Sequence, residues 1–301
     1  MTRIFSGEPK TQFTGALSVE ARQRMLRLRG EPFFFSGWKR VAFIHFEVDP
    51  KILQREVPFE LDLHNGKAYV SLVAFHLENM RPRLGGKLAA FLMKPVATHK
   101  FLNIRAYVRH GNETGIYFLA EYLPNKLSLH LGPLLYGLPY RLGKLDYHHQ
   151  HETREIFGRV SDGKLSLNYR IDLHADGEFQ PCEAGTLDEF LLERYTAFTF
   201  RNGICRHFCI WHPPWPQMRV EGEVSRADLL LATGDWFQQS QLIGAHYSPG
   251  IKNVWMGRPR CFRRVREMPT TRTLSLDNFP WAAHLARVAL APERNKPGSA
   301  P

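Results

Sequence analysis

Residues 205–216, CRHFCIWHPPWP, contain two cysteines and two histidines at a spacing that suggests a zinc site. On a strand, Cys205 and Cys209 would point to the same face, but about 13 Å apart. Zinc holds its ligands within ~2.0–2.3 Å, so one strand cannot supply both thiolates. A helix would bring these side chains together, but the two prolines after His212 argue against a helix. We therefore expect core packing with a partly exposed His212, and no metal site.

Residues 146–152, DYHHQHE, form a second cluster of residue types that bind metals. In an extended segment His149 and His151 share a face and His148 opposes them. Histidines before a polar hairpin are more often solvated than bound to a metal, and no Cys-x-x-Cys motif supports either cluster. Phosphate-binding loops of the types G-x-G-x-x-G and G-x-x-x-x-G-K-[ST] do not occur in the sequence. The sequence therefore predicts no metal and no cofactor.

The stretch FLNIRAYVR, residues 101–109, places its polar side chains on one face of a predicted strand. Asn103, Arg105 and Tyr107 alternate with aliphatic residues, so they point to the opposite side. If this polar face lines a cavity, Arg105 can bind a carboxylate through two parallel hydrogen bonds. Two alternatives stay open, in which Arg105 is outward and solvated or is paired with Glu121 on the adjacent strand.

The elements that must position these residues are mostly strands. Apolar runs rich in β-branched and aromatic residues are separated by turn signals such as GNET at 111–114 and SDG at 161–163. Hairpin-linked strands with a few helices predict an antiparallel α+β fold that is closed or nearly closed on itself. The predicted strands cover 39–48, 67–78, 101–110, 115–123, 154–160, 164–174, 203–212 and 253–258.

Four segments have helical signals. A basic amphipathic stretch ends at Gly30, and we expect it to pack against the body of the protein. Asp49 and Pro50 are typical of a helix start, and Thr186 with Glu189 forms a capping box. The predicted helices cover 17–30, 49–57, 186–198 and 280–290.

The net charge of +11 is concentrated at the two ends of the chain. Residues 1–30 hold six Lys and Arg against two acids, residues 252–301 hold ten against three, and the charges between them balance. Since the folded body is neutral, we expect no nucleic-acid partner. Without a secretory signal or an apolar stretch of about 20 residues, we expect a soluble cytoplasmic protein with free cysteines. The expected parts are a basic N-terminal extension (1–37), a barrel domain (38–264) and a basic C-terminal extension with a disordered tail (265–301).

The central part of the chain carries five motifs that are specific in combination. They are FLNIRAYVR (101–109), YGLPYRLGKL (136–145), GTLDEFLLERYTAFT (185–199), WHPPWPQ (211–217) and YSPGIKNVWMGRPR (247–260). In these motifs the sequence resembles the YqjF-like family (domain of unknown function 2071) over roughly residues 38–262. This family is grouped with the acetoacetate decarboxylase-like superfamily. The resemblance therefore implies antiparallel strands curled into a cone-like closed barrel around a central cavity.

The resemblance also implies that one catalytic group has been replaced. Acetoacetate decarboxylases form a Schiff base through a lysine of a Gly-x-Pro-Lys-Lys stretch, whose lowered pKa leaves the amine neutral enough to attack a ketone. The corresponding stretch here is GLPYR, residues 137–141. Tyr140 stands in the place of the nucleophile, and a phenol cannot form an imine. The nearest replacement amine, Lys144, would need a different geometry.

We predict a small-molecule-binding or catalytic domain whose ligand is a small organic acid or keto compound. The expected chemistry is acid–base catalysis on an enolisable substrate, in which Tyr140 protonates an enolate that Arg105 stabilises. Tyr140 and Arg105 are therefore the expected catalytic residues. The expected ligand-binding residues are Asn103, Arg105, Glu121 and Arg141.

Two other functions stay open. In the first, the protein is a non-enzymatic module whose basic ends bind an acidic partner or, weakly, a membrane surface. In the second and weaker one, Cys205 and Cys209 carry out redox chemistry. Decarboxylases of the superfamily assemble into homo-oligomers, but no stretch of this sequence identifies an interface.

Overall fold

The computed structural model describes residues 15–174 and 177–262 of the 301-residue chain. The described residues all belong to one compact unit, and everything below concerns this unit. The predicted helix at 280–290 and the predicted tail lie outside the described residues.

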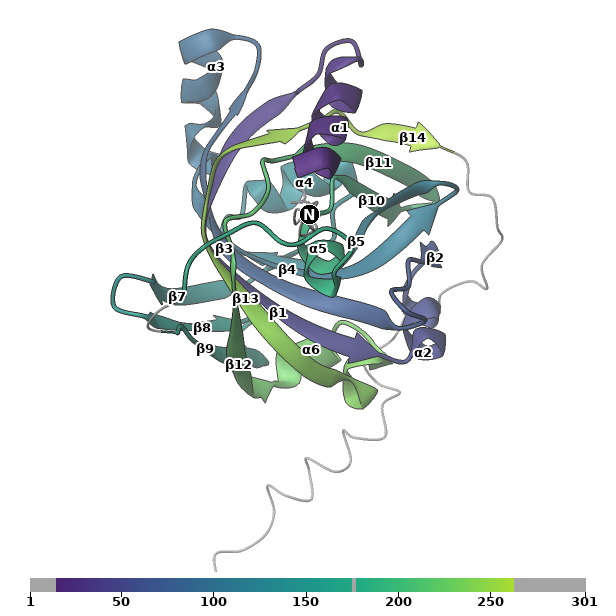
Figure 1. Cartoon of the computed structure of the whole chain (residues 1–301). Helices are drawn as coiled ribbons and strands as arrows, with labels where there is room; N and C mark the ends of the chain where they lie inside the picture. Colours follow the sequence, from purple (N-terminus) through teal and green to yellow (C-terminus); the bar gives the residue numbers. More distant parts are fainter. Residues whose placement is uncertain (1–14, 175–176, 263–301) are drawn as a thin grey trace, which may run out of the picture. The chain divides into compact units, whose positions relative to one another are not determined.

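Seven strands close into a ring (Figure 1). Around the ring the order is β11, β10, β5, β4, β3, β1 and β13, and the pair Ile210–Met256 with the pair Trp211–Trp255 joins β13 back to β11. All neighbours in the ring are antiparallel except β10 and β5. The prediction of a closed, mostly antiparallel sheet is confirmed, although the ring is not a regular barrel. The strands are β1 (Phe34–Val48), β3 (Ala68–Pro82), β4 (His99–His110), β5 (Glu113–Leu123), β10 (Thr196–Arg201), β11 (Ile204–Trp211) and β13 (Gln241–Met256).

A second layer of strands continues from β13 and covers part of the outer face of the ring. The order is β12, β9, β8 and β7, all antiparallel, and Figure 1 shows these strands at the lower left. Three short strands pair at other edges of the ring. The bounds are β12 (Met218–Ala227), β9 (Ser166–Asp172), β8 (Glu155–Ser161), β7 (Lys144–Gln150), β2 (Glu60–Leu61), β6 (Tyr140–Leu142) and β14 (Arg260–Phe262).

The ring strands are buried on both faces, which explains their nearly continuous apolar sequences. Ile44, Leu72 and Ile104 point outward and pack with residues of the second layer such as Val160, and this cluster is called the outer core. The alternate residues point inward and form the inner core, which is rich in aromatic side chains. The separation of faces predicted for residues 101–109 is therefore present, because the aliphatic residues lie in the outer core and Tyr107 in the inner core.

Most of the helices lie at the edges of the ring. The first, α1, packs against β11, where Ser18 donates its hydroxyl to the carbonyl of His212 and Trp211 donates its indole N–H to the carbonyl of Ser18. No described helix is long and apolar enough to cross a membrane. The helices are α1 (Gly15–Leu26), α2 (Pro50–Glu56), α3 (Gly86–Met93), α4 (Ser128–Tyr136), α5 (Leu187–Leu192) and α6 (Asp228–Leu231), with 3-10 turns η1 (Lys94–Val96) and η2 (Asp235–Gln239).

The helix predicted over 186–198 is much shorter than expected. Its start is as predicted, because the Thr186 hydroxyl accepts the Glu189 amide N–H at 3.3 Å. The helix ends at Leu192, and the chain enters the strand β10 at Thr196. The segment TAFTF is rich in threonine and phenylalanine, which favour a pleated strand over a helix.

Candidate functional site

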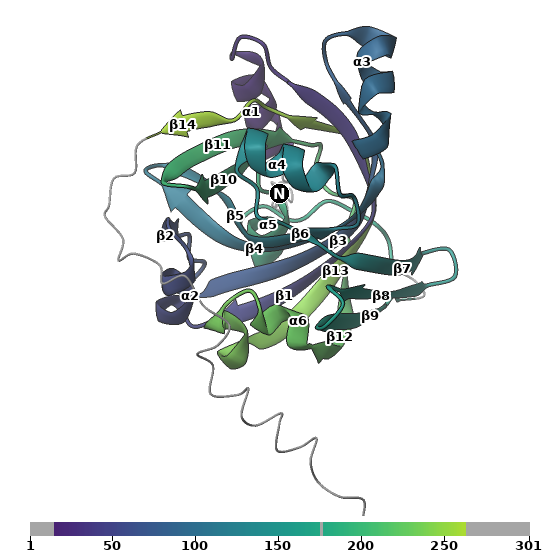
Figure 2. The ribbon, with the colours of Figure 1, turned by 180° about the vertical axis from the view of Figure 1, so that it is seen from behind.

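A cavity of about 220 Å³ lies between the inner core and α4. In Figure 2, α4 is seen across the open end of the ring. Aromatic and aliphatic side chains from seven strands and two helices form most of its wall. The polar residues of the wall include His99, Asn103, Glu121, Ser128 and Tyr140.

Three of these polar residues form a row across neighbouring strands. Asn103 on β4 stands opposite Glu121 on β5, and Glu121 is in turn the neighbour of Tyr140 on β6. A β-bulge in β5 makes this row, because Ile104 pairs with Ala120 but Arg105 pairs with Phe118. The register shift leaves both Phe118 and Glu121 facing inward, three positions apart.

The ring of Tyr140 is fixed between α4 and the wall of the cavity. Its centroid lies 5.7 Å from that of Phe101, which stacks on Phe75 at 5.4 Å. On the other side, Gly132 of α4 passes so close that a Cβ atom there would lie 2.1 Å from Cε2 of Tyr140. Only glycine permits this approach of the helix backbone to the tyrosine ring.

The electrostatics of the cavity favour neutral groups. Burial raises the pKa of the Glu121 carboxyl well above its ordinary value, which favours the protonated form. Burial, with Glu121 and Tyr136 adding, also raises the pKa of the Tyr140 phenol. Oε2 of Glu121 and Oδ1 of Asn103 are buried without a hydrogen-bond partner among the described residues. Such orphaned atoms are costly in a core, and they mark a place where a ligand can complete the hydrogen bonding.

Sequence reasoning missed His99 and Ser128, which also line the cavity. His99 Nδ1 donates to the carbonyl of Lys100 at 3.2 Å, since a carbonyl can only accept. Its Nε2 therefore carries the lone pair and lies 3.4 Å from the Ser128 hydroxyl. Burial lowers the pKa of His99, which keeps the imidazole neutral and able to accept a proton. No sequence signal marks this histidine, because its separation from Glu121 is neither local nor periodic.

Arg105 lies in a different part of the interior. Its guanidinium donates from Nη2 to the carbonyl of Leu191 at 2.9 Å, and the Tyr107 hydroxyl donates to the same oxygen at 2.8 Å. Leu191 belongs to α5, so Arg105 and Tyr107 anchor this helix inside the ring. Arg105 does not line the cavity. The structure therefore does not bring Arg105 to Tyr140.

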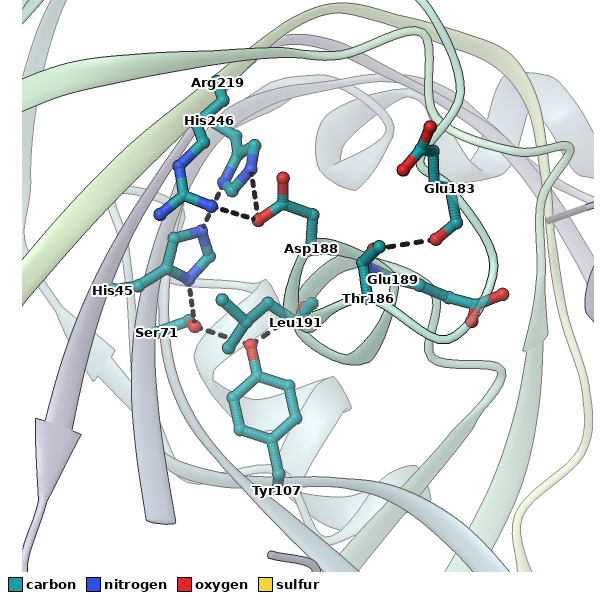
Figure 3. A network of polar contacts seen from close by, with 10 residues as sticks. All are labelled: His45, Ser71, Tyr107, Glu183, Thr186, Asp188, Glu189, Leu191, Arg219 and His246. Atoms are coloured by element: carbon teal, nitrogen blue, oxygen red, sulfur yellow. Dashed lines mark hydrogen bonds and ion pairs between the residues drawn. The ribbon is translucent and has the colours of Figure 1, made fainter. Parts of the chain in front are cut away.

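A chain of polar side chains leads from this anchor toward the surface (Figure 3). Consecutive members lie between 2.6 and 3.3 Å apart. Burial, with His246 and then Arg105 adding, lowers the pKa of His45 well below its ordinary value. At its outer end the chain reaches Arg219, which forms an ion pair with Asp188 at 2.8 Å. In order from the surface, the members are Asp188, His246, His45, Ser71 and Tyr107.

Arg141 lies on the outer side of β6. Its Nη1 donates to the hydroxyl of Tyr122 at 3.2 Å and to the carbonyl of Ala232 at 3.0 Å. Tyr122 belongs to the outer core, on the opposite face of the sheet from the cavity. The predicted site residues thus separate into three places. Asn103, Glu121 and Tyr140 line the cavity, Arg105 holds α5, and Arg141 faces outward.

Both metal-like stretches include a histidine that is more buried than predicted. His212 is 2% exposed, because the rings of Tyr195 and Trp215 cover it at 4.8 and 4.9 Å. The expectation of a partly exposed His212 was wrong. His149 is also buried rather than solvated, and its two nitrogens lie 2.6 Å from the carbonyl of Arg40 and 2.7 Å from the Tyr169 hydroxyl. Within residues 15–174 and 177–262, no group of three His, Cys, Asp or Glu side chains could hold a metal ion.

Two comparisons of the sequence identify relatives. The profile of the DUF2071 family, described as "uncharacterized conserved protein", matches residues 36–252. The uncharacterized protein YqjF of Bacillus subtilis (strain 168) is 28% identical over 190 residues, which cover 62% of this chain and 76% of that protein.

Solved structures with the same fold include acetoacetate decarboxylase from Legionella pneumophila. It has a TM-score of 0.54 and 12% sequence identity, and the match covers 76% of this chain and 86% of the decarboxylase. The enduracididine biosynthesis enzyme MppR, complexed with pyruvate, also has a TM-score of 0.54, with 14% identity over 78% of this chain and 90% of that enzyme. The fold is therefore acetoacetate decarboxylase-like, and at these identities the likeness concerns the fold alone.

Proposed function

The chain belongs to the DUF2071 family, and for this member we propose that the cavity binds a small neutral carbonyl compound and transfers protons to and from it. The observation that supports this proposal most strongly is Glu121, a buried carboxyl that lines an apolar cavity and whose Oε2 lacks a partner among the described residues. Burial raises its pKa, which favours the protonated form. A structural neighbour complexed with pyruvate supports a carbonyl group in the ligand, while the carboxylate of pyruvate has no counterpart in the neutral compound proposed here.

The described wall of the cavity has no cationic side chain, which favours a neutral ligand over an anionic one. Among the described residues, no lysine or arginine lines the cavity. A carboxylate bound there would lose its water without gaining a cation, which is unfavourable in an apolar environment. A ketone or an ester loses less on leaving water, and its carbonyl oxygen can accept a hydrogen bond from the Glu121 carboxyl.

The proposed reaction is the enolisation of this carbonyl compound. The imidazole of His99 accepts the proton from the carbon next to the carbonyl, and the electron pair of the broken C–H bond forms the carbon–carbon double bond. Glu121 gives its proton to the carbonyl oxygen. Tyr140 and Asn103 position the substrate through hydrogen bonds. Both groups are restored when His99 returns a proton to carbon and the enol hydroxyl returns its proton to Glu121. The net reaction is proton exchange, or isomerisation when the proton returns to a different carbon.

Hydrogen–deuterium exchange tests this proposal. Cyclohexanone, acetophenone and methyl acetoacetate are incubated with the protein in D₂O, and loss of the α-proton signal is followed by NMR. We expect the wild type to accelerate exchange of at least one compound, and Glu121→Gln to lose about 100-fold or more of that acceleration. Lys144→Met is the matched control and should exchange like the wild type. Equal rates with Glu121→Gln, or loss with Lys144→Met, would contradict the proposal.

The alternative of a module tethered by its basic ends stays a prediction. Nine of the sixteen Lys and Arg residues that it invokes lie in residues 1–14 and 263–301, outside the described residues.

A further inference from the structure

The helix α3 is apolar but has no buried residue. Its sequence is GKLAAFLM, and Leu88, Phe91 and Leu92 are each about two-thirds exposed or more. In both Figure 1 and Figure 2 the helix stands beyond the rim of the ring. A solvent-exposed helix normally turns polar residues outward, so these three side chains indicate a surface that contacts something apolar.

The helix α4 adds to the same apolar surface. Leu134 is 75% exposed, and Leu127 and Leu135 are about half exposed. The two helices are joined through η1, because the Asn125 side chain donates to the carbonyl of Pro95 at 2.6 Å. We call this the α3–α4 surface. Its exposed apolar residues are Leu84, Leu88, Phe91, Leu92, Leu127, Leu134 and Leu135, seven of the fifteen large exposed hydrophobic residues in the described chain.

The charged residues of this surface all have one sign. No Asp or Glu occurs between Glu78 and Glu113 or between Glu121 and Asp146. Glu78 and Asp146 themselves lie within ion-pair distance of Lys39 and Lys100. Apart from Arg109, which pairs with Glu60, the exposed cations of the two segments are Arg81, Arg83, Lys87, Lys94, Lys126 and Lys144. Among the described residues, Lys87, Lys94 and Lys126 have no ion-pair partner.

We propose that the α3–α4 surface docks on an anionic membrane surface, with its leucines and Phe91 in the headgroup boundary and its lysines on the lipid headgroups. Apolar side chains flanked by lysine are the composition of helices that lie in this boundary. A second copy of the chain fits less well, because a two-fold interface would place cation against cation without an acid. The sequence after residue 262 is also basic, so it does not complement this surface either.

The cavity lies next to the α3–α4 surface, so docking could deliver a ligand to it. Met93 of α3, Val96 of η1 and Leu135 of α4 line the cavity as well as adjoining the α3–α4 surface. A membrane docked here would lie against that wall, so an apolar carbonyl compound could enter from the lipid without crossing water. This delivery rests on the proposed function, whereas the docking itself does not.

Cosedimentation of the full chain with vesicles tests the docking. The vesicles contain phosphatidylcholine alone or phosphatidylcholine with phosphatidylserine. We expect binding to the anionic vesicles, weakened about tenfold or more in Leu88→Glu/Phe91→Glu and in Lys87→Glu/Lys94→Glu. The matched control is Phe157→Glu, which replaces an exposed phenylalanine of β8 away from this surface, and it should bind like the wild type.

Three results would overturn the docking. The first is that the wild type does not bind the vesicles. The second is that Leu88→Glu/Phe91→Glu binds as strongly as the wild type, which would assign the binding to the basic ends. The third is that the wild type forms a dimer without lipid and that this variant is monomeric in sedimentation equilibrium. Glu121→Gln separates this proposal from the proposed function. This variant should bind vesicles like the wild type and lose proton exchange. If the wild type instead catalyses exchange but does not bind vesicles, the proposed function stands and the docking is refuted.

Discussion

Glu121 is an ionisable group placed where nothing stabilises its charged form. It is 4% exposed, its neighbours are largely aromatic, and Oε2 has no hydrogen-bond partner among the described residues. A purely structural residue at this position would be better as leucine, because an unpaired buried carboxyl costs stability. The carboxyl therefore makes the cavity a candidate for chemistry rather than only a defect of packing.

The raised pKa of Glu121 predicts how stability depends on pH. The folded state holds the proton more tightly than the unfolded state, whose carboxyl titrates near 4.5. The contribution of Glu121 is therefore fully present below this pH and is lost as pH rises toward the folded-state pKa. Glu121→Gln should be the more stable protein at about pH 8. Urea unfolding of both proteins across pH measures the difference, and parallel profiles would contradict the raised pKa.

The position of Tyr140 predicts the result of restoring an amine. If this side chain occupies the place of a Schiff-base lysine, Tyr140→Lys should form an imine with a small ketone in the apolar cavity. Borohydride reduction would then give a stable adduct, located at position 140 by mass spectrometry. The wild type and Tyr140→Phe should give none. An adduct at Lys144 in the wild type would overturn the assignment.

At the scale of elements, the close approach of α4 to β6 holds the cavity in shape. Gly132→Ala would put a methyl group against the aromatic ring of Tyr140, and we expect a loss of about 1–3 kcal/mol in unfolding free energy. Gly15→Ala is the matched control, because open space surrounds that position. Adding Tyr140→Ala to Gly132→Ala should recover part of the loss in a double-mutant cycle. Strict additivity would show that the two residues do not touch.

The hairpins could be predicted from the sequence because their signals are local. GNET joins β4 to β5 and SDG lies between β8 and β9, as the turn residues require. The bulge in β5 could not be predicted, since YFLAEY has no glycine or other mark of an extra residue. Simple alternation would turn Leu119 and Glu121 to the same face, whereas Leu119 packs on the outer core. A single inserted residue therefore places Glu121 in the cavity.

Part of the candidate site could be predicted because local sequence signals mark the hairpin that joins two of its strands. Asn103, Glu121 and Tyr140 lie on three adjacent strands, two of them joined by a hairpin that the sequence marks. Arg105 shares its face with Asn103, but α5 occupies that end of the ring. The position of α5 depends on contacts between residues 84 and 86 positions apart, and no local pattern encodes such contacts.

At the scale of the whole molecule, closing the ring buries several imidazoles. Burial is the first cause of the lowered pKa in each case, reaching about 4 in His76 and His212 and about 3 in His149. His45 shifts in the same direction. These groups must be neutral in the folded protein but become protonated below their ordinary value of 6.5 when it unfolds.

The sign of this effect is opposite to that of Glu121. The stability from the neutral histidines is present above about pH 6.5 and is lost as pH falls through the folded-state values. We expect the unfolding free energy to fall steeply between about pH 6 and 4. His149→Gln should reduce the slope, while His130→Gln, which changes an exposed residue, should not. If the midpoint of urea unfolding does not change with pH in this range, the pKa values of the interior histidines are not lowered and the prediction is wrong.

The measurement that tests the central claim most directly is an infrared difference spectrum between the wild type and Glu121→Gln at neutral pH. A protonated carboxylic acid in an apolar site has a carbonyl stretch separate from that of carboxylates. The neutral-acid site predicts this band in the wild type, its loss in Glu121→Gln, and a shift when cyclohexanone is added. A spectrum with only carboxylate bands, or a band that the ketone leaves unchanged, would contradict a neutral Glu121 that binds the substrate carbonyl.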